Sequence, residues 1–110
     1  MVFFQWHKGK KQEYREITAK ELKERLIAKE NFVLLDVRTP EEFKEFHILG
    51  SILIPYNDIE KRHTELRVGK DKEIVVICRS GNRSAIACKT LYALGYRNIA
   101  NVKDGILGWN

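Results

Sequence analysis

The stretch IVVICRSGNRS, residues 74–84, decides the fold and carries the most informative chemistry of the chain. Residues 74–77 are all β-branched, which is typical of a buried strand. A polar loop with one glycine follows at once, and the apolar spacing over residues 82–94 predicts a helix. The order strand, tight loop, helix therefore places Cys78 at the carboxyl end of a strand and at the base of a loop.

Two helix-start signals lie upstream of this stretch. TAKE at residues 18–21 and TPEE at residues 39–42 are both capping boxes, and the second also has proline at the first helical position. The first predicts a helix to about Lys29 and the second a short helix. Between them the continuous apolar run 32–35 predicts a central strand that ends at Asp36.

The remaining segments continue the alternation of strands and helices. We expect a short strand over residues 51–54, a helix capped by Asn57 or Asp58 that runs to about Leu66, and a last strand over residues 99–102. Alternating elements of these lengths predict an α/β domain with a mainly parallel sheet and right-handed crossovers. Ligands of such sheets bind at the carboxyl ends of the strands.

The composition indicates one globular domain. The 110 residues, 44% hydrophobic and 32% charged, are enough for a single core and exclude a two-domain enzyme. We assign residues 14–110 to the domain and residues 1–13 to a basic, aromatic tail. Much of the net charge of +5 lies in residues 1–15, and elsewhere bases alternate with acids. We therefore expect no nucleic-acid partner.

The sequence predicts a cytoplasmic protein that does not enter a membrane. No apolar run approaches the roughly 18 residues that cross a bilayer, and Gln5 and His7 interrupt the apolar start. Cys78 and Cys88 are too few for a disulfide scaffold, which favours a reducing compartment. A secretory protein whose leader has been removed stays open as an alternative.

The loop after Cys78 has the pattern of an anion cradle. Successive N–H groups of a tight glycine loop, together with the first turn of a helix, point at one place. A free thiol is only about 3% ionised at pH 7, and a useful thiolate needs roughly 2.7 kcal/mol of stabilisation. Two or three amide hydrogen bonds supply more than a helix dipole or an exposed arginine does. We expect the amides to activate Cys78, and Arg79 and Arg83 to attract an anionic substrate.

Other reactive side chains have structural interpretations. Cys88 lies in the middle of a predicted helix and is expected to pack in the core. His47 lies in a turn far upstream of the loop and is not assigned as a base. The histidines are scattered, so no metal site is predicted. Arg38 and Glu42 lie four residues apart across a helix start and are expected to pair with each other.

Several motifs, in order, resemble those of the single-domain rhodanese-like sulfurtransferases. LDVRTPEEF at residues 35–43, HI at 47–48 and GSILIP at 50–55 resemble the opening motif of that family. ICRSGNRS at residues 77–84 resembles its active-site loop, and LGY at 94–96 resembles part of its closing signature. The resemblance covers nearly the whole chain apart from the tail.

The resemblance implies a rhodanese-like α/β fold, with a five-stranded, mainly parallel sheet flanked by helices on both faces. It implies a thiosulfate sulfurtransferase in which Cys78 takes sulfane sulfur from thiosulfate or another persulfide donor and holds it as a persulfide. The acceptor is then a thiol or cyanide, a sulfur-relay protein is a candidate partner, and no metal or organic cofactor is needed.

The resemblance also assigns roles to residues around Cys78. Asp36 is expected to brace the loop. Arg38 is a second supporting residue, because it could face the pocket instead of pairing with Glu42. The residues expected to form the substrate-binding loop are Arg79, Ser80, Gly81, Asn82, Arg83 and Ser84.

Two other functions remain alternatives. A cysteine-dependent phosphatase or arsenate reductase ranks lower, because four residues separate Cys78 from Arg83 here and five do so in the phosphatases. The tighter loop leaves less room for a tetrahedral oxyanion. A non-enzymatic sulfur-carrier or protein-interaction module that uses the same loop is the other alternative, and the sequence does not separate it from an enzyme.

Overall fold

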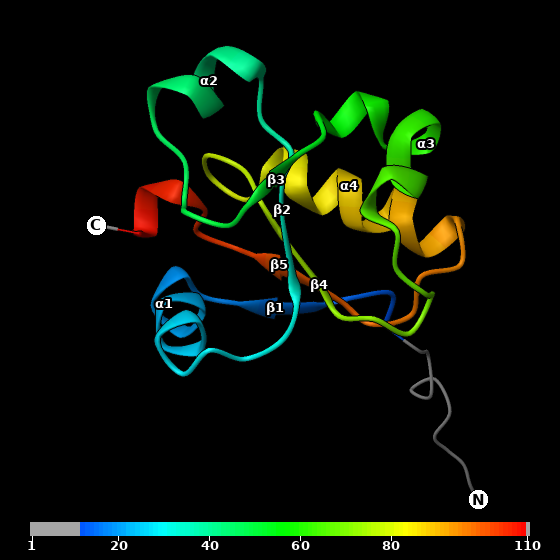
Figure 1. Ribbon diagram of the computed structural model, residues 1–110, viewed down its shortest axis with the longest axis horizontal. Coiled ribbons are helices and arrows are strands. Elements are labelled where there is room, and N and C mark those ends of the chain that lie inside the picture. The colour runs from blue at the N-terminus through cyan, green and yellow to red at the C-terminus, as the bar shows by residue number, and fades with distance from the viewer. Residues whose placement is uncertain (1–11, 110) are drawn as a thin grey trace, which may run out of the picture.

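The structure is a computed structural model that describes residues 12–109, and it contains one twisted sheet with helices packed on both faces (Figure 1). Most of the predicted tail, residues 1–11, lies outside the described residues. Among residues 12–109, no helix has the length and apolar character needed to cross a membrane.

The sheet has five strands in the order β1-β5-β4-β2-β3, and every neighbouring pair is parallel. This confirms the predicted five-stranded α/β fold. The strands are β1 (Arg15–Ile17), β2 (Val33–Asp36), β3 (Ile52–Leu53), β4 (Ile74–Ile77) and β5 (Ile99–Val102). The strand predicted as central, β2, is an inner strand, whereas the middle of the sheet is β4.

Strand β4 contributes to a core on each side of the sheet. Ile74 and Val76 pack into the cluster that contains the buried residues of α4, and Val75 and Ile77 pack into the cluster that contains those of α1. All four side chains are fully buried, as expected when helices cover both faces of a parallel sheet. This double burial explains why the strand is a continuous apolar run.

The first two helices begin where the capping signals predict. The described residues contain four α-helices, which are α1 (Ala19–Ile27), α2 (Pro40–Glu45), α3 (Ile59–Arg62) and α4 (Asn82–Ala93). At both Thr18 and Thr39 the side chain accepts from the third helical amide, and the glutamate at that position accepts from the threonine amide. These complete capping boxes fix the starts of α1 and α2.

Three segments differ from the predictions. The edge strand β1 has no apolar pattern, because two of its three residues are exposed and it is held by pairing with β5. The helix predicted to reach Leu66 is broken into a 3₁₀ turn (Tyr56–Asp58), α3 and a second 3₁₀ turn (His63–Leu66), and Asp58 makes no side-chain cap. A further 3₁₀ turn, Ile106–Gly108, was not predicted.

Candidate active site

Cys78 lies directly after β4, where the chain turns toward α4. Gly81 makes this turn with a φ of +97°, a left-handed conformation that favours glycine. A β-carbon at this position would also collide with the backbone carbonyl of Lys103. The turn lets α4 begin at Asn82, so the first turn of that helix lies beside the sulfur.

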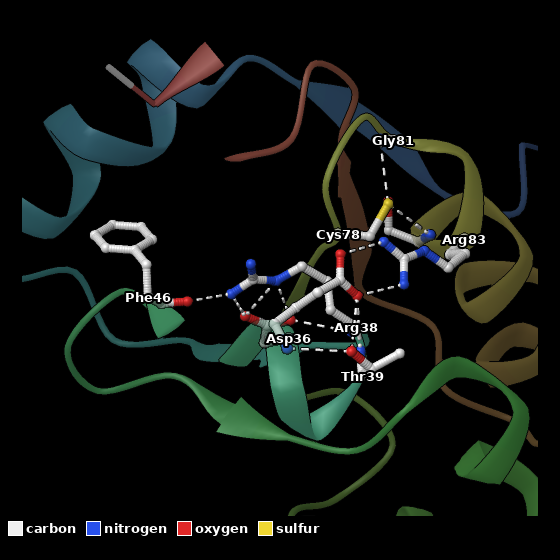
Figure 2. Close-up of polar contacts among 9 residues, drawn as sticks. Asp36, Arg38, Thr39, Phe46, Cys78, Gly81 and Arg83 are labelled. Atoms are coloured by element: carbon white, nitrogen blue, oxygen red, sulfur yellow. Dashed lines mark hydrogen bonds and ion pairs between the residues drawn. The ribbon is translucent and has the colours of Figure 1, made fainter. Parts of the chain in front are cut away.

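Three hydrogen-bonding groups of the loop surround the sulfur of Cys78. The Gly81 amide lies 3.2 Å from Sγ and the Ser84 amide 3.3 Å from it, and both donate to the sulfur. The Ser84 hydroxyl oxygen is also 3.3 Å from Sγ. It accepts from the neutral thiol and can donate to the thiolate. Figure 2 shows the contact from Gly81 to Cys78.

These contacts set the acidity of the cysteine. Burial raises the pKa of the Cys78 thiol, but hydrogen bonds from the Ser84 hydroxyl and from the backbone of Ser84, Ser80 and Gly81 outweigh it, so the pKa lies below its ordinary value. In contrast, burial raises the pKa of Cys88, which is fully buried in the core. The two cysteines thus differ in chemistry, and only Cys78 is placed to form a thiolate.

The segment that follows β5, residues 105–109, donates hydrogen bonds to carbonyls of the loop. The amides of Ile106 and Leu107 donate to the carbonyls of Cys78 and Arg79 at 2.9 and 3.0 Å. Gly105 passes so close to the Arg79 carbonyl that a β-carbon there would collide with it. No sequence pattern predicts these backbone contacts, and the only sequence signal at this place is the glycine itself.

Asn101 on β5 also supports the loop. Its side chain is 1% exposed, and its amide nitrogen donates to the carbonyl of Gly81 at 3.3 Å. Gly81 is the residue whose own amide contacts the sulfur. Sequence reasoning missed this residue, because an asparagine inside a short strand gives no sign of which loop it faces.

The segment that follows β5 is also fixed to α1. The carboxylate of Asp104 accepts from the Ala19 amide at 2.7 Å, at the start of the helix. Lys23 donates to the Trp109 carbonyl at 2.8 Å, and its ammonium lies 4.5 Å from the centre of the Trp109 ring. The 105–109 segment therefore connects α1 to the 78–84 loop.

The predicted pairing of Arg38 with Glu42 is wrong. Arg38 pairs with Asp36 at 2.8 Å, with both side chains buried, and it also donates to the Phe46 carbonyl at 2.6 Å (Figure 2). Arg38 precedes Thr39, the N-cap of α2, and so lies outside the helix. The contact geometry of residues four apart applies only within a helix, so the predicted pair does not form.

Asp36 and Arg38 form a support at the end of β2. Asp36 also accepts from the backbone amide of Arg38 at 3.0 Å, and it lies beside Ile77 in the sheet register. Asp36 was expected to brace the loop, but its hydrogen bonds go to Arg38. Through Arg38 it fixes the position of Phe46, after α2.

Glu42 pairs with Arg83 instead. Two hydrogen bonds, of 2.8 and 3.0 Å, join the guanidinium to the two carboxylate oxygens. Of the other predicted loop residues, Arg79, Ser80 and Asn82 are exposed. His47, which was not assigned as a base, is held by the Phe43 carbonyl at 2.8 Å.

Comparisons with known proteins agree on one family. A family model described as "Rhodanese-like domain" matches residues 18–110. A protein named "Sulfurtransferase" from Allochromatium vinosum is 37% identical over 94 residues, which are 86% of this chain and 86% of that protein. The "Putative sulfur carrier protein" of Bacillus subtilis is also 37% identical over 94 residues, but the chain spans only 50% of its length.

A solved structure supports the same relationship. The rhodanese-like domain protein from Staphylococcus aureus superposes with a TM-score of 0.79 at 31% sequence identity. The match covers 87% of this chain and 91% of that chain.

Proposed function

This chain belongs to the rhodanese-like domain family, and on that premise we propose that it transfers sulfane sulfur through a persulfide on Cys78. The observation that carries the proposal is the set of donors around Sγ: the amides of Gly81 and Ser84 and the Ser84 hydroxyl. Donors fixed in this way favour a sulfur that carries negative charge.

In the first half-reaction the Cys78 thiolate attacks the outer sulfur of the donor. With thiosulfate, an S–S bond forms to Sγ, the S–S bond of the donor breaks, and its electron pair leaves with sulfite. Charge balances, because a thiolate and a dianion become a persulfide anion and sulfite. In this proposal the loop amides that stabilise the thiolate also stabilise the persulfide anion.

In the second half-reaction an acceptor removes the sulfur. Cyanide or a thiol attacks the outer sulfur of the persulfide, the S–S bond breaks, and its electron pair returns to Cys78 as the thiolate. Two half-reactions that share one covalent intermediate predict ping-pong kinetics. A sulfur-relay protein is the proposed partner when the acceptor is a protein thiol. The cytoplasmic location stays a prediction.

The burial of Cys78 adds a requirement to this mechanism. The residue is 1% exposed, whereas Arg79, Ser80 and Asn82 around it are exposed. The proposed transfer therefore requires the loop to shift so that a donor can reach the sulfur. Between turnovers the same burial keeps water and bulky oxidants away from the sulfur.

A sulfur carrier without catalytic turnover is the second candidate, and the name of the Bacillus subtilis relative favours it. A carrier and an enzyme form the same persulfide. They differ in turnover, because an enzyme regenerates the thiolate many times with a small acceptor. The phosphatase alternative has no support in the family assignment.

The test is to incubate the protein with thiosulfate, measure the intact mass and follow sulfite release, then add cyanide and follow thiocyanate. We expect a mass gain of one sulfur atom, located on Cys78, and repeated turnover. Cys78→Ala should abolish both, and Cys88→Ala is the matched control that should retain both. Sulfur transfer by Cys78→Ala would overturn the proposal, as would hydrolysis of an aryl phosphate by a wild-type protein that ignores sulfur donors. Loading without turnover would favour the carrier.

A further inference from the structure

The ion pair between Glu42 and Arg83 joins α2 to α4 at the loop. The two hydrogen bonds are 2.8 and 3.0 Å long, and each side chain is 28% exposed. A bidentate pair of this kind is directional and holds both groups in place. Arg83 immediately precedes Ser84, whose amide and hydroxyl contact the sulfur of Cys78. Figure 2 shows the Arg83 guanidinium near Cys78. The pKa of Arg83 is raised mainly by its hydrogen bonds to Glu42 and further by the charge of Cys78, so the pair borders the reacting centre.

Glu42 is also held at the start of its own helix. It completes the capping box of α2, where it accepts from the Thr39 amide at 3.0 Å. The hydrogen bond from Arg83 is the main reason that the pKa of Glu42 is lowered, to about 2. At neutral pH the carboxylate is charged, and it compensates the charge of Arg83.

The three arginines on or beside the loop therefore differ in the charge that they offer a ligand. Arg38 is compensated by Asp36, and Arg83 is compensated by Glu42. Among the ion pairs of residues 12–109, none involves Arg79, which is exposed. A doubly charged donor gains the full electrostatic attraction of Arg83 only if it displaces the carboxylate of Glu42, which already binds the guanidinium.

We infer that Glu42 determines donor specificity, and that the site favours sulfur donors with one negative charge or none at the reacting end over the thiosulfate dianion. Persulfides carried on thiols belong to the favoured class. This inference rests on the proposed function, since it concerns the donor of the same half-reaction. Glu42 is in this sense a positioning residue, because it acts through Arg83 and through its own charge.

The half-reaction with the favoured class balances without any further reagent. The Cys78 thiolate attacks the terminal sulfur of R–S–SH, an S–S bond forms to Sγ, and the S–S bond of the donor breaks. The electron pair leaves with the thiolate RS⁻, and the proton stays on the new persulfide until it moves to solvent. No species carries more than one negative charge at the reacting centre.

The test compares two donors that differ by one charge and have similar size. Thiosulfate is a dianion, and methanethiosulfonate, in which a methyl group replaces one oxygen, is a monoanion. We would measure kcat/KM for each donor with cyanide as acceptor, in wild type and in Glu42→Gln. Glutamine also serves at the third position of a capping box, so this substitution removes the charge and keeps the helix start.

The matched control is Glu21→Gln, which makes the same change in the capping box of α1, where the Thr18 amide donates to Glu21 at 2.8 Å. In Glu42→Gln the ratio of kcat/KM for thiosulfate to that for methanethiosulfonate should rise about three- to tenfold at low salt. The rise should shrink as salt screens the charges. In Glu21→Gln the ratio should not change.

An unchanged ratio in Glu42→Gln, or an equal change in Glu21→Gln, overturns the inference and leaves the proposed function standing. If neither donor loads Cys78 in wild type, the proposed function fails, and the inference fails with it. The salt dependence in wild type and in Arg79→Gln gives a second test that leaves Glu42 in place. Because Arg79 makes none of the ion pairs in the described part of the chain and Arg83 is compensated, kcat/KM for thiosulfate should fall with salt in wild type and depend only weakly on salt in Arg79→Gln. A steep fall that persists in Arg79→Gln would contradict the inference.

Discussion

Ser84 contacts the sulfur of Cys78 through both its amide and its hydroxyl, so it is the single residue with the most direct influence on the thiolate. A hydrogen bond to a charged group contributes about 1.5–3 kcal/mol. Ser84→Ala keeps the amide and removes the hydroxyl. We expect the pKa of Cys78 to rise by about one to two pH units.

The measurement for this prediction is the pH dependence of alkylation by iodoacetamide, with Cys88→Ala as the background so that only one thiol reacts. Ser80→Ala is the control, because it removes an exposed hydroxyl from the same loop. A Cys78 titration that is the same in Ser84→Ala and in the background would contradict the assigned role of the hydroxyl.

At the scale of single residues, the sequence is informative about Cys78 and much less so about its charged neighbours. The order strand, glycine loop, helix predicts amides that point at the sulfur, because that geometry is local. The partner of Glu42 is Arg83, 41 residues away, and that contact depends on how α2 and α4 pack. No local spacing rule identifies such a pair, and the rule for residues four apart selected Arg38 wrongly.

Among the elements, the turn at Gly105 lies directly against the backbone of the 78–84 loop. Gly105 has a φ of +60° and touches the Arg79 carbonyl, whereas Gly50 has a φ of +91° and nothing within 4 Å of a β-carbon. Alanine at Gly50 adds only backbone strain, of about 1 kcal/mol. Alanine at Gly105 adds a collision to that strain.

We expect Gly105→Ala to lower the free energy of unfolding by about 2–4 kcal/mol and Gly50→Ala by about 1 kcal/mol. Urea unfolding of the two variants measures the difference. Gly105→Ala should also slow sulfur loading of Cys78. The collision displaces the backbone of residues 78 and 79, and the sulfur of Cys78 moves with that backbone. Equal destabilisation by the two substitutions would show that the close approach has no energetic effect.

The elements that the sequence predicts well are those that carry their own signals. The capping boxes at Thr18 and Thr39 mark the starts of α1 and α2, and the β-branched run marks β4. The strand β1 and the turn over residues 106–108 have no such signals. They form because β5 and the loop supply hydrogen-bond partners, and those contacts exist only after the chain has folded.

Over the whole molecule, the ion pairs make stability depend on pH in the acid range. Arg83 lowers the pKa of Glu42 to about 2, and Arg25, through its hydrogen bonds, lowers the pKa of Glu73. The folded pKa of each group is below its unfolded value. Their contribution to stability is therefore complete above the unfolded pKa, near 4.5, and is lost as the pH falls through the folded values.

We expect the free energy of unfolding to fall as the pH is lowered from 5 toward 2, and about 1–2 kcal/mol of that loss to come from Glu42, because its partial exposure weakens the pair. Urea unfolding of wild type and Glu42→Gln at several pH values separates this contribution. The difference between the two proteins should shrink toward low pH. A difference that stays constant with pH would mean that the charge of Glu42 does not stabilise the fold.

The connection between the 105–109 segment and the loop also affects biosynthesis. A ribosome delivers Cys78 before it delivers Ile106 and Leu107, whose amides hold the carbonyls of Cys78 and Arg79. The nascent polypeptide thus carries a thiol that lacks its finished surroundings until translation has passed residue 107. The site that we propose for sulfur transfer is complete only when those late residues have emerged from the exit tunnel and bound the loop carbonyls.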